Sequence, residues 1–220
     1  MKHNATKRAL LADLGPRLKP HGFGARPVGQ THRRGFPLGR QAVHLSFIDH
    51  DEDFDVTVDV AVRFDAVEGL VHRTNSLLSK SEKAQTYTLG AELGNIERRE
   101  PRRWTVGSPA NVSTTAVAIE ASLLGVGFPY LNMYSDPHVA LAMLARDDQE
   151  AWLHSPIDAE RAKRAVALLV MVGRPEELGD LGRRKMEYLE SVGDRGLAGF
   201  RRFWEALRGD LEVRVGEIGF

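Results

Sequence analysis

The sequence predicts an α+β fold in which an antiparallel sheet is followed by a run of helices. Three observations support it: strict apolar–polar alternation over residues 54–64, an acidic turn just before that stretch, and helical spacing of apolar residues from about residue 112. Strands that come first and helices that follow are typical of α+β proteins. We therefore expect an N-terminal helix, then the sheet, then a C-terminal run of helices packed on one face of it.

The length of 220 residues fits one large domain or two small ones. We expect a single α+β domain over 1–220, sheet-rich over 1–110 and helical over 111–210, because a half-buried sheet needs a layer over its apolar face. An alternative is that 151–210 forms a separate helical extension.

The N-terminal region begins with a helix. Apolar residues recur at helical spacing from Thr6 to Leu14, and we expect Gly15 and Pro16 to interrupt the helix there. The Gly- and Arg-rich stretch 22–40 that follows is expected to hold one or two short strands separated by turns.

The clearest pattern belongs to a β-hairpin. Residues 42–47 alternate between polar and apolar, the acidic turn 49–53 follows, and the alternation then continues to residue 64. We expect one set of side chains to be buried: Phe54, Val56, Val58, Val60, Val62 and Phe64. We expect the other set to face solvent or a ligand: Asp55, Thr57, Asp59 and Arg63. A slip of one residue would bury two aspartates at a cost of several kcal/mol, so the register should be firm.

The elements after the hairpin are weaker. We expect a short helix capped by Asp65, a loop over 75–84, and two further strands over 86–91 and 103–106.

The C-terminal half reads as helices separated by glycines and prolines. A helix from Val112 is expected to end at Gly125, and Asp136 followed by Pro137 is typical of a helix start. Three more helices are expected over 156–208. Three aromatic residues of the last one are assigned to core packing: Phe200, Phe203 and Trp204. The alternating residues of 211–215 suggest a short final strand.

Composition excludes several classes of protein. The chain has no cysteine, so it forms no disulfide, thiolate metal site or iron–sulfur cluster. Lys and Arg together number 30, as do Asp and Glu, and this lack of a basic excess argues against a nucleic-acid partner. No stretch of 18 uncharged apolar residues and no signal peptide are recognisable, so we expect no membrane association and a cytoplasmic location.

The neutral total conceals a segregation of charge. Residues 1–45 carry nine Lys or Arg and one acid, whereas 46–70 carry eight acids and one Arg. The two segments could simply neutralise each other as neighbours in the sheet. Alternatively, they form a split surface that attracts a partner. We identify one candidate binding face from these residues: His44, Asp55, Asp59, Arg63, Arg33 and Arg34.

The acidic turn invites comparison with metal sites. Asp49, Asp51 and Asp53 have the spacing that opens a calcium loop, but the later glycine and glutamate positions do not match. Adjacent His50 and Asp51, with His44 on the neighbouring strand, leave a metal-dependent hydrolase open as an alternative. Phosphate-loop, dinucleotide, zinc-protease and serine-hydrolase motifs are missing. We therefore expect no cofactor, no catalytic residues and no assigned metal site.

Several short motifs occur in a familiar order along residues 6–146: Leu18 to Phe23, the strand 55–64, Thr88 to Leu93, Arg103-Trp104 and Gly127 to Leu131. In this order they resemble an uncharacterised bacterial family of small α+β proteins, a domain of unknown function. Some relatives are thought to be immunity proteins paired with toxins. The resemblance implies a non-enzymatic, cytosolic protein that binds another protein. A small-ligand module is a third reading.

Overall fold

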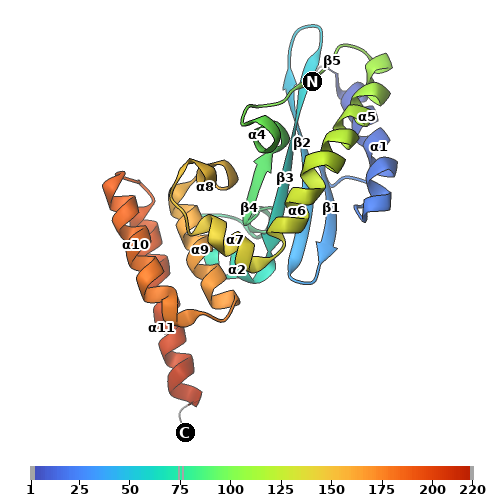
Figure 1. Cartoon of the computed structure of the whole chain (residues 1–220). Coiled ribbons are helices and arrows are strands. Elements are labelled where there is room, and N and C mark those ends of the chain that lie inside the picture. Colours follow the sequence, from blue (N-terminus) through green and yellow to red (C-terminus); the bar gives the residue numbers. More distant parts are fainter. Residues whose placement is uncertain (1–2, 74, 76, 219–220) are drawn as a thin grey trace. The chain divides into compact units, whose positions relative to one another are not determined.

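The computed structural model describes residues 3–73, 75 and 77–218 (Figure 1). The chain divides into two compact units, and each is made of two separate segments. The first unit comprises 1–62 and 90–135, and the second comprises 63–89 and 136–220. The fold is α+β with an antiparallel sheet, as the sequence predicts.

The sheet has the strand order β1-β2-β3-β4, and β5 pairs with the beginning of β3. Its strands are β1 (Thr31–Phe36), β2 (Gly39–Asp49), β3 (Phe54–Phe64), β4 (Leu89–Glu92) and β5 (Trp104–Val106). The predicted hairpin is present as β2 and β3. Its acidic turn is closed by a hydrogen bond of 3.0 Å that the His50 N–H donates to the carbonyl of Asp53.

The alternation in β3 sets the face of the sheet that is buried. All six apolar residues of the predicted inward set have no exposed surface. On the other face Thr57 and Asp59 are half-buried. Asp55 and Arg63 were expected to face solvent or a ligand, but both are buried by polar partners that lie far away in sequence.

Helices of the first unit supply much of its core. They are α1 (Asn4–Leu18), η1 (Lys19–His21), α4 (Leu93–Arg98), η2 (Pro109–Asn111), α5 (Val112–Ser122), η3 (Leu123–Gly127) and α6 (Phe128–Tyr134). The predicted interruption of α1 at Gly15 is wrong. The helix continues through Pro16 to Leu18, and buried Leu14 and Leu18 hold this last turn against the core.

The predicted end of α5 at Gly125 is also wrong. Residues Leu123–Gly127 form a π-helical turn that carries the helix directly into α6. A Cβ at Gly127 would lie 2.8 Å from Leu123 Cδ2 and 3.0 Å from Leu93 Cδ2, so a side chain there would force these leucines to shift. Gly127 thus lets the helix pack closely against Leu93 and Leu123.

The resulting stretch Pro109–Tyr134 is long and apolar enough to cross a membrane by length and composition alone. Core helices pass the same test. Within the first unit this stretch buries Ala116, Ile119, Leu123 and Leu131 completely, as a core helix does.

The second unit is helical. Its elements are α2 (Asp65–Val71), α3 (Lys80–Lys83), α7 (Pro137–Leu144), α8 (Gln149–His154), α9 (Asp158–Met171), η4 (Pro175–Glu177), α10 (Leu178–Ser191) and α11 (Leu197–Ile218). The three helices predicted over 156–208 are confirmed as α9, α10 and α11. The final strand predicted over 211–215 is wrong, since α11 continues through it. The predicted loop 75–84 contains α3, which Ser79 and Glu82 cap reciprocally.

A buried carboxylate joins α2 to α9 in this unit. Glu68 has no exposed surface and accepts hydrogen bonds from Thr86 Oγ1 at 2.7 Å, Thr88 Oγ1 at 3.1 Å and Arg164 Nε at 2.9 Å. His72 Nε2 lies 3.2 Å from it. Burial opposes the charge, but Arg164 and the hydrogen bonds outweigh it and hold the pKa of Glu68 far below its ordinary value.

Candidate functional site

Three residues of the predicted binding face lie on the sheet of the first unit: Arg33 in β1, His44 in β2 and Asp59 in β3. Thr31 of β1 pairs with His44 of β2, and Thr31 Oγ1 lies 2.8 Å from His44 Nδ1. Burial, with Arg33 nearby, lowers the pKa of His44, so the ring is neutral at pH 7. Strand alternation puts Arg33 and His44 on the face opposite the buried valines.

Asp59 occupies the same face farther along the sheet. Burial raises the pKa of its carboxyl. The pKa of Glu92 is also raised, first by burial and additionally by the charge of Asp59. Glu92 caps α4 by accepting hydrogen bonds from the N–H groups of Gly94 at 3.0 Å and Asn95 at 3.1 Å. The carboxylates of Asp59 and Glu92 therefore repel each other, and Glu92 has a structural role as the cap of α4.

Asp55 serves to hold the edge of the sheet together. It accepts a hydrogen bond of 2.7 Å from Thr105 Oγ1, its partner in β5, and lies 3.2 Å from His50 Nε2 and 3.7 Å from Arg103 Nη1. The hydrogen bond from Thr105 lowers the pKa of Asp55 despite partial burial. The group is engaged internally rather than presented to a ligand.

Arg34 lies on the opposite face from Arg33. Its guanidinium donates to the carbonyl of His21 at 2.8 Å and to Asn132 Oδ1 at 2.8 Å, and it also bonds Gln41. It stacks over Phe23 with its central carbon 4.9 Å from the ring centroid. Arg34 therefore ties the strands to α6 and does not share a face of the sheet with Arg33 and His44.

Arg63 belongs to the second unit and is likewise internal. Its Nη1 donates to the carbonyls of Lys83 at 3.0 Å and Thr86 at 2.9 Å, and its Nε donates to Asp65 at 2.7 Å. Of the predicted face, His44, Arg33 and Asp59 thus remain as surface candidates. Arg34, Asp55 and Arg63 do not.

The metal alternative receives no geometric support. Among the described residues, no group of three or more His, Asp or Glu side chains is arranged to hold a metal ion. His44 pairs with Thr31 and His50 pairs with Asp55, so they do not converge with Asp51. Asp49, the first residue of the calcium-like spacing, makes an ion pair of 2.6 Å with Lys7.

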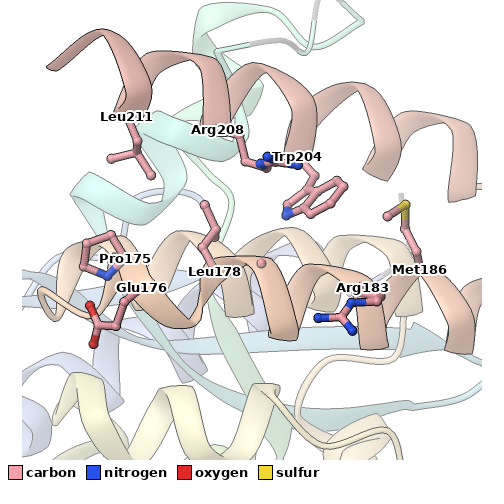
Figure 2. Close-up of a pocket in the computed structure, with 9 residues that line it drawn as sticks. Pro175, Glu176, Leu178, Arg183, Met186, Trp204, Arg208 and Leu211 are labelled. Carbon is pink, nitrogen blue, oxygen red and sulfur yellow. The ribbon is translucent and has the colours of Figure 1, made fainter. Parts of the chain in front are cut away.

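A different surface stands out in the second unit. An apolar groove of about 900 Å³ runs between α10 and α11 (Figure 2). Its lining combines large apolar side chains with cations: Pro175, Glu176, Leu178, Gly179, Arg183, Met186, Trp204, Arg208 and Leu211. Figure 2 shows Trp204 and Leu211 on one wall and Leu178 and Met186 on the other.

The groove exists because α11 has two apolar sides. Phe200, Phe203 and Leu207 are buried. Trp204 and Leu211 remain half-exposed beside α10. The assignment of all three aromatic residues to the core is therefore confirmed for the two phenylalanines, whereas Trp204 lines the groove.

Trp204 is the largest side chain of the groove. Its indole packs against Gly182 of α10, and Arg208 stacks over it with the guanidinium carbon 5.0 Å from the ring centroid. The indole Nε1 is buried and makes no hydrogen bond within the structure as described. The aromatic ring is thus held in place from two sides while one edge stays open to the groove.

Sequence reasoning missed this surface, although a signal for it exists. Positions 179, 183 and 186 of α10, and 204, 208 and 211 of α11, follow helical spacing beside the residues that form the core. A second row of residues at helical spacing, next to the row that faces the core, indicates a helix that packs on two sides.

No family model, no curated protein and no solved structure matches this chain, so the groove has to be interpreted from its own chemistry.

Proposed function

We propose that this chain is a protein-binding module and that the groove between α10 and α11 is its binding surface. The single observation that carries the proposal is the combination of Trp204, Met186 and Leu211 with Arg183 and Arg208 in one open groove. Trp, Met and Arg are the residue types enriched where proteins bind one another. A groove between two helices is the usual receptor for the apolar face of a third helix.

The proposed partner is a protein rather than a nucleic acid or a membrane. The equal numbers of basic and acidic residues favour this class. A cytoplasmic, immunity-like role in a bacterium is one form of the proposal, and it depends on the motif resemblance alone. The groove itself requires only an amphipathic helix as ligand.

Site-specific photo-crosslinking tests the proposal. A photoreactive phenylalanine analogue in place of Met186 should form an adduct with a protein in the source cells, and Leu211→Glu in the same chain should abolish it. The matched control places the analogue at Leu77, which is 92% exposed and outside the groove. Absence of any adduct at position 186, or an adduct that Leu211→Glu leaves unchanged, would contradict the proposal.

A further inference from the structure

We propose that a cleft in the second unit, between α7 and α10, binds a small organic carboxylate that has an apolar body. The proposal is independent of the groove between α10 and α11, because the two sites share no lining residue and use opposite sides of α10. The cleft has a volume of about 210 Å³. An apolar cavity of roughly 150 Å³ holds a benzene ring, so this cleft has room for such a ring and a carboxylate.

The floor of the cleft is apolar and is built by three helices of the same unit. α9 contacts both α7 and α10, and Figure 1 shows it between them. Leu141 of α7, Leu169 of α9 and Leu181 of α10 line the cleft and are buried. Ala142 and Ala145 complete the wall that α7 contributes, and their small side chains leave the space open. An apolar ligand would therefore displace water from these leucines.

The rim of the cleft carries more positive than negative charge. Its cations are Arg174 and Arg184, and Glu177 is the one acid among the lining residues. Glu177 already forms an ion pair with Arg174 at 2.5 Å. Arg184 is exposed and has no ion pair and no hydrogen bond within the part of the chain that the structure describes. The cleft therefore presents one guanidinium without an opposite charge beside an apolar floor.

A carboxylate matches Arg184 in both charge and geometry. The planar guanidinium can donate two parallel hydrogen bonds to the two oxygens of a carboxylate, and such bonds are stronger than neutral ones. His138 lies on the same rim and offers an imidazole nitrogen as a second polar contact. Burial lowers the pKa of the neighbouring Lys185, and the charge of Arg184 lowers it further. A bound anion would offset this repulsion between the two cations.

Titration of the full chain with sodium benzoate at constant ionic strength tests the proposal, with NMR of the backbone amides as the readout. Benzoate should shift the amides of Ala142 and Leu181 until the site is saturated. Benzamide has the same ring without the charge, and acetate has the charge without the ring. Each should bind more weakly than benzoate by roughly tenfold or more. Equal binding of benzoate and either compound, or no saturable shift with benzoate, would overturn the proposal.

Two variants and one control locate the site. Arg184→Gln should weaken benzoate binding by roughly tenfold or more, because it removes the charged donor. Arg183→Gln is the matched control, since the exposed Arg183 pairs with Asp180 and lies outside the cleft. Ala142→Phe should abolish binding, because its ring fills the cleft from an exposed position.

Circular dichroism of each variant verifies that the helices are retained, and all three changes are made at exposed positions. Arg183→Gln should bind benzoate as the wild type does. If it weakens binding as much as Arg184→Gln, or if Ala142→Phe binds like the wild type, benzoate occupies another part of the surface and the proposal is overturned.

Discussion

The indole of Trp204 occupies the space that a side chain at Gly182 would need. A Cβ built on Gly182 would collide with three atoms of the ring, including Nε1. The close approach of α10 and α11 therefore depends on a glycine inside α10, where glycine is otherwise unfavourable for the helix. The position of Trp204 in the groove depends on the same residue.

Gly182→Ala should destabilise the protein by about 1–3 kcal/mol, because the added methyl group forces the indole or the helix to move. Gly179→Ala is the matched control in the same helix. No atom lies within 4 Å of a Cβ there, so alanine should stabilise the helix by about 0.5–1 kcal/mol. Denaturant unfolding measures both, and equal effects of the two variants would contradict the packing described.

Glu68→Gln should destabilise the protein by about 3–5 kcal/mol, because the half-buried Arg164 guanidinium loses the opposite charge of the fully buried Glu68. The exposed Glu176→Gln controls for the change of a carboxylate to an amide. Thermal melting of both variants measures the difference. If Glu68→Gln and Glu176→Gln have the same melting temperature, the ion pair between Glu68 and Arg164 does not stabilise the second unit.

Asp59→Asn should stabilise the protein at neutral pH. Burial raises the pKa of Asp59 above its ordinary value of 3.8, so the folded state is penalised whenever this group is ionised. That penalty is fully present above the raised pKa and disappears as the pH falls below 3.8. The advantage of the variant should therefore shrink as the pH is lowered. Chemical denaturation at a series of pH values measures it, with exposed Asp51→Asn as control. A gain that is independent of pH would argue against a charge effect.

A chain that ends at Glu150 should lose the cooperative melting of its second unit and become less soluble. It lacks α9, and with it Arg164 and the apolar surface that covers α2. A chain that ends at Leu211 keeps the buried Phe200, Phe203 and Leu207 and should melt close to the full-length temperature. Calorimetry distinguishes the two, and full-length melting of the shorter chain would show that these helices are an independent appendage.

The sequence predicts the sheet well where a single short-range rule applies. Alternation over β3 specifies which valines are buried, because a period of two residues leaves no other arrangement with an apolar core. It cannot predict that Asp55 and Arg63 are buried, since their partners Thr105 and Thr86 are distant in sequence.

Helix ends were harder to predict for a physical reason. Gly125 and Pro16 usually interrupt helices, but a π-helical turn and packing of the last turn keep these helices continuous. Alternation over 211–215 fits a strand as well as a helix when only five residues are considered. The groove could not be predicted from the sequence, because Trp204 has the same helical spacing as the core residues Phe200 and Phe203. Only the position of α10 distinguishes Trp204 from these two phenylalanines.

The division of each unit into two separated segments has a consequence for synthesis on the ribosome. Every segment of the first unit has been made once Ser135 is added, whereas Glu68 is translated 96 residues before Arg164. At about 5–20 residues per second, that interval lasts about 5 to 20 s. For this time residues 63–89 form a nascent insertion that carries a carboxylate without its cation, while the sheet around it can already assemble. Chaperones that bind incomplete chains on the ribosome would therefore bind this protein in a partly folded state.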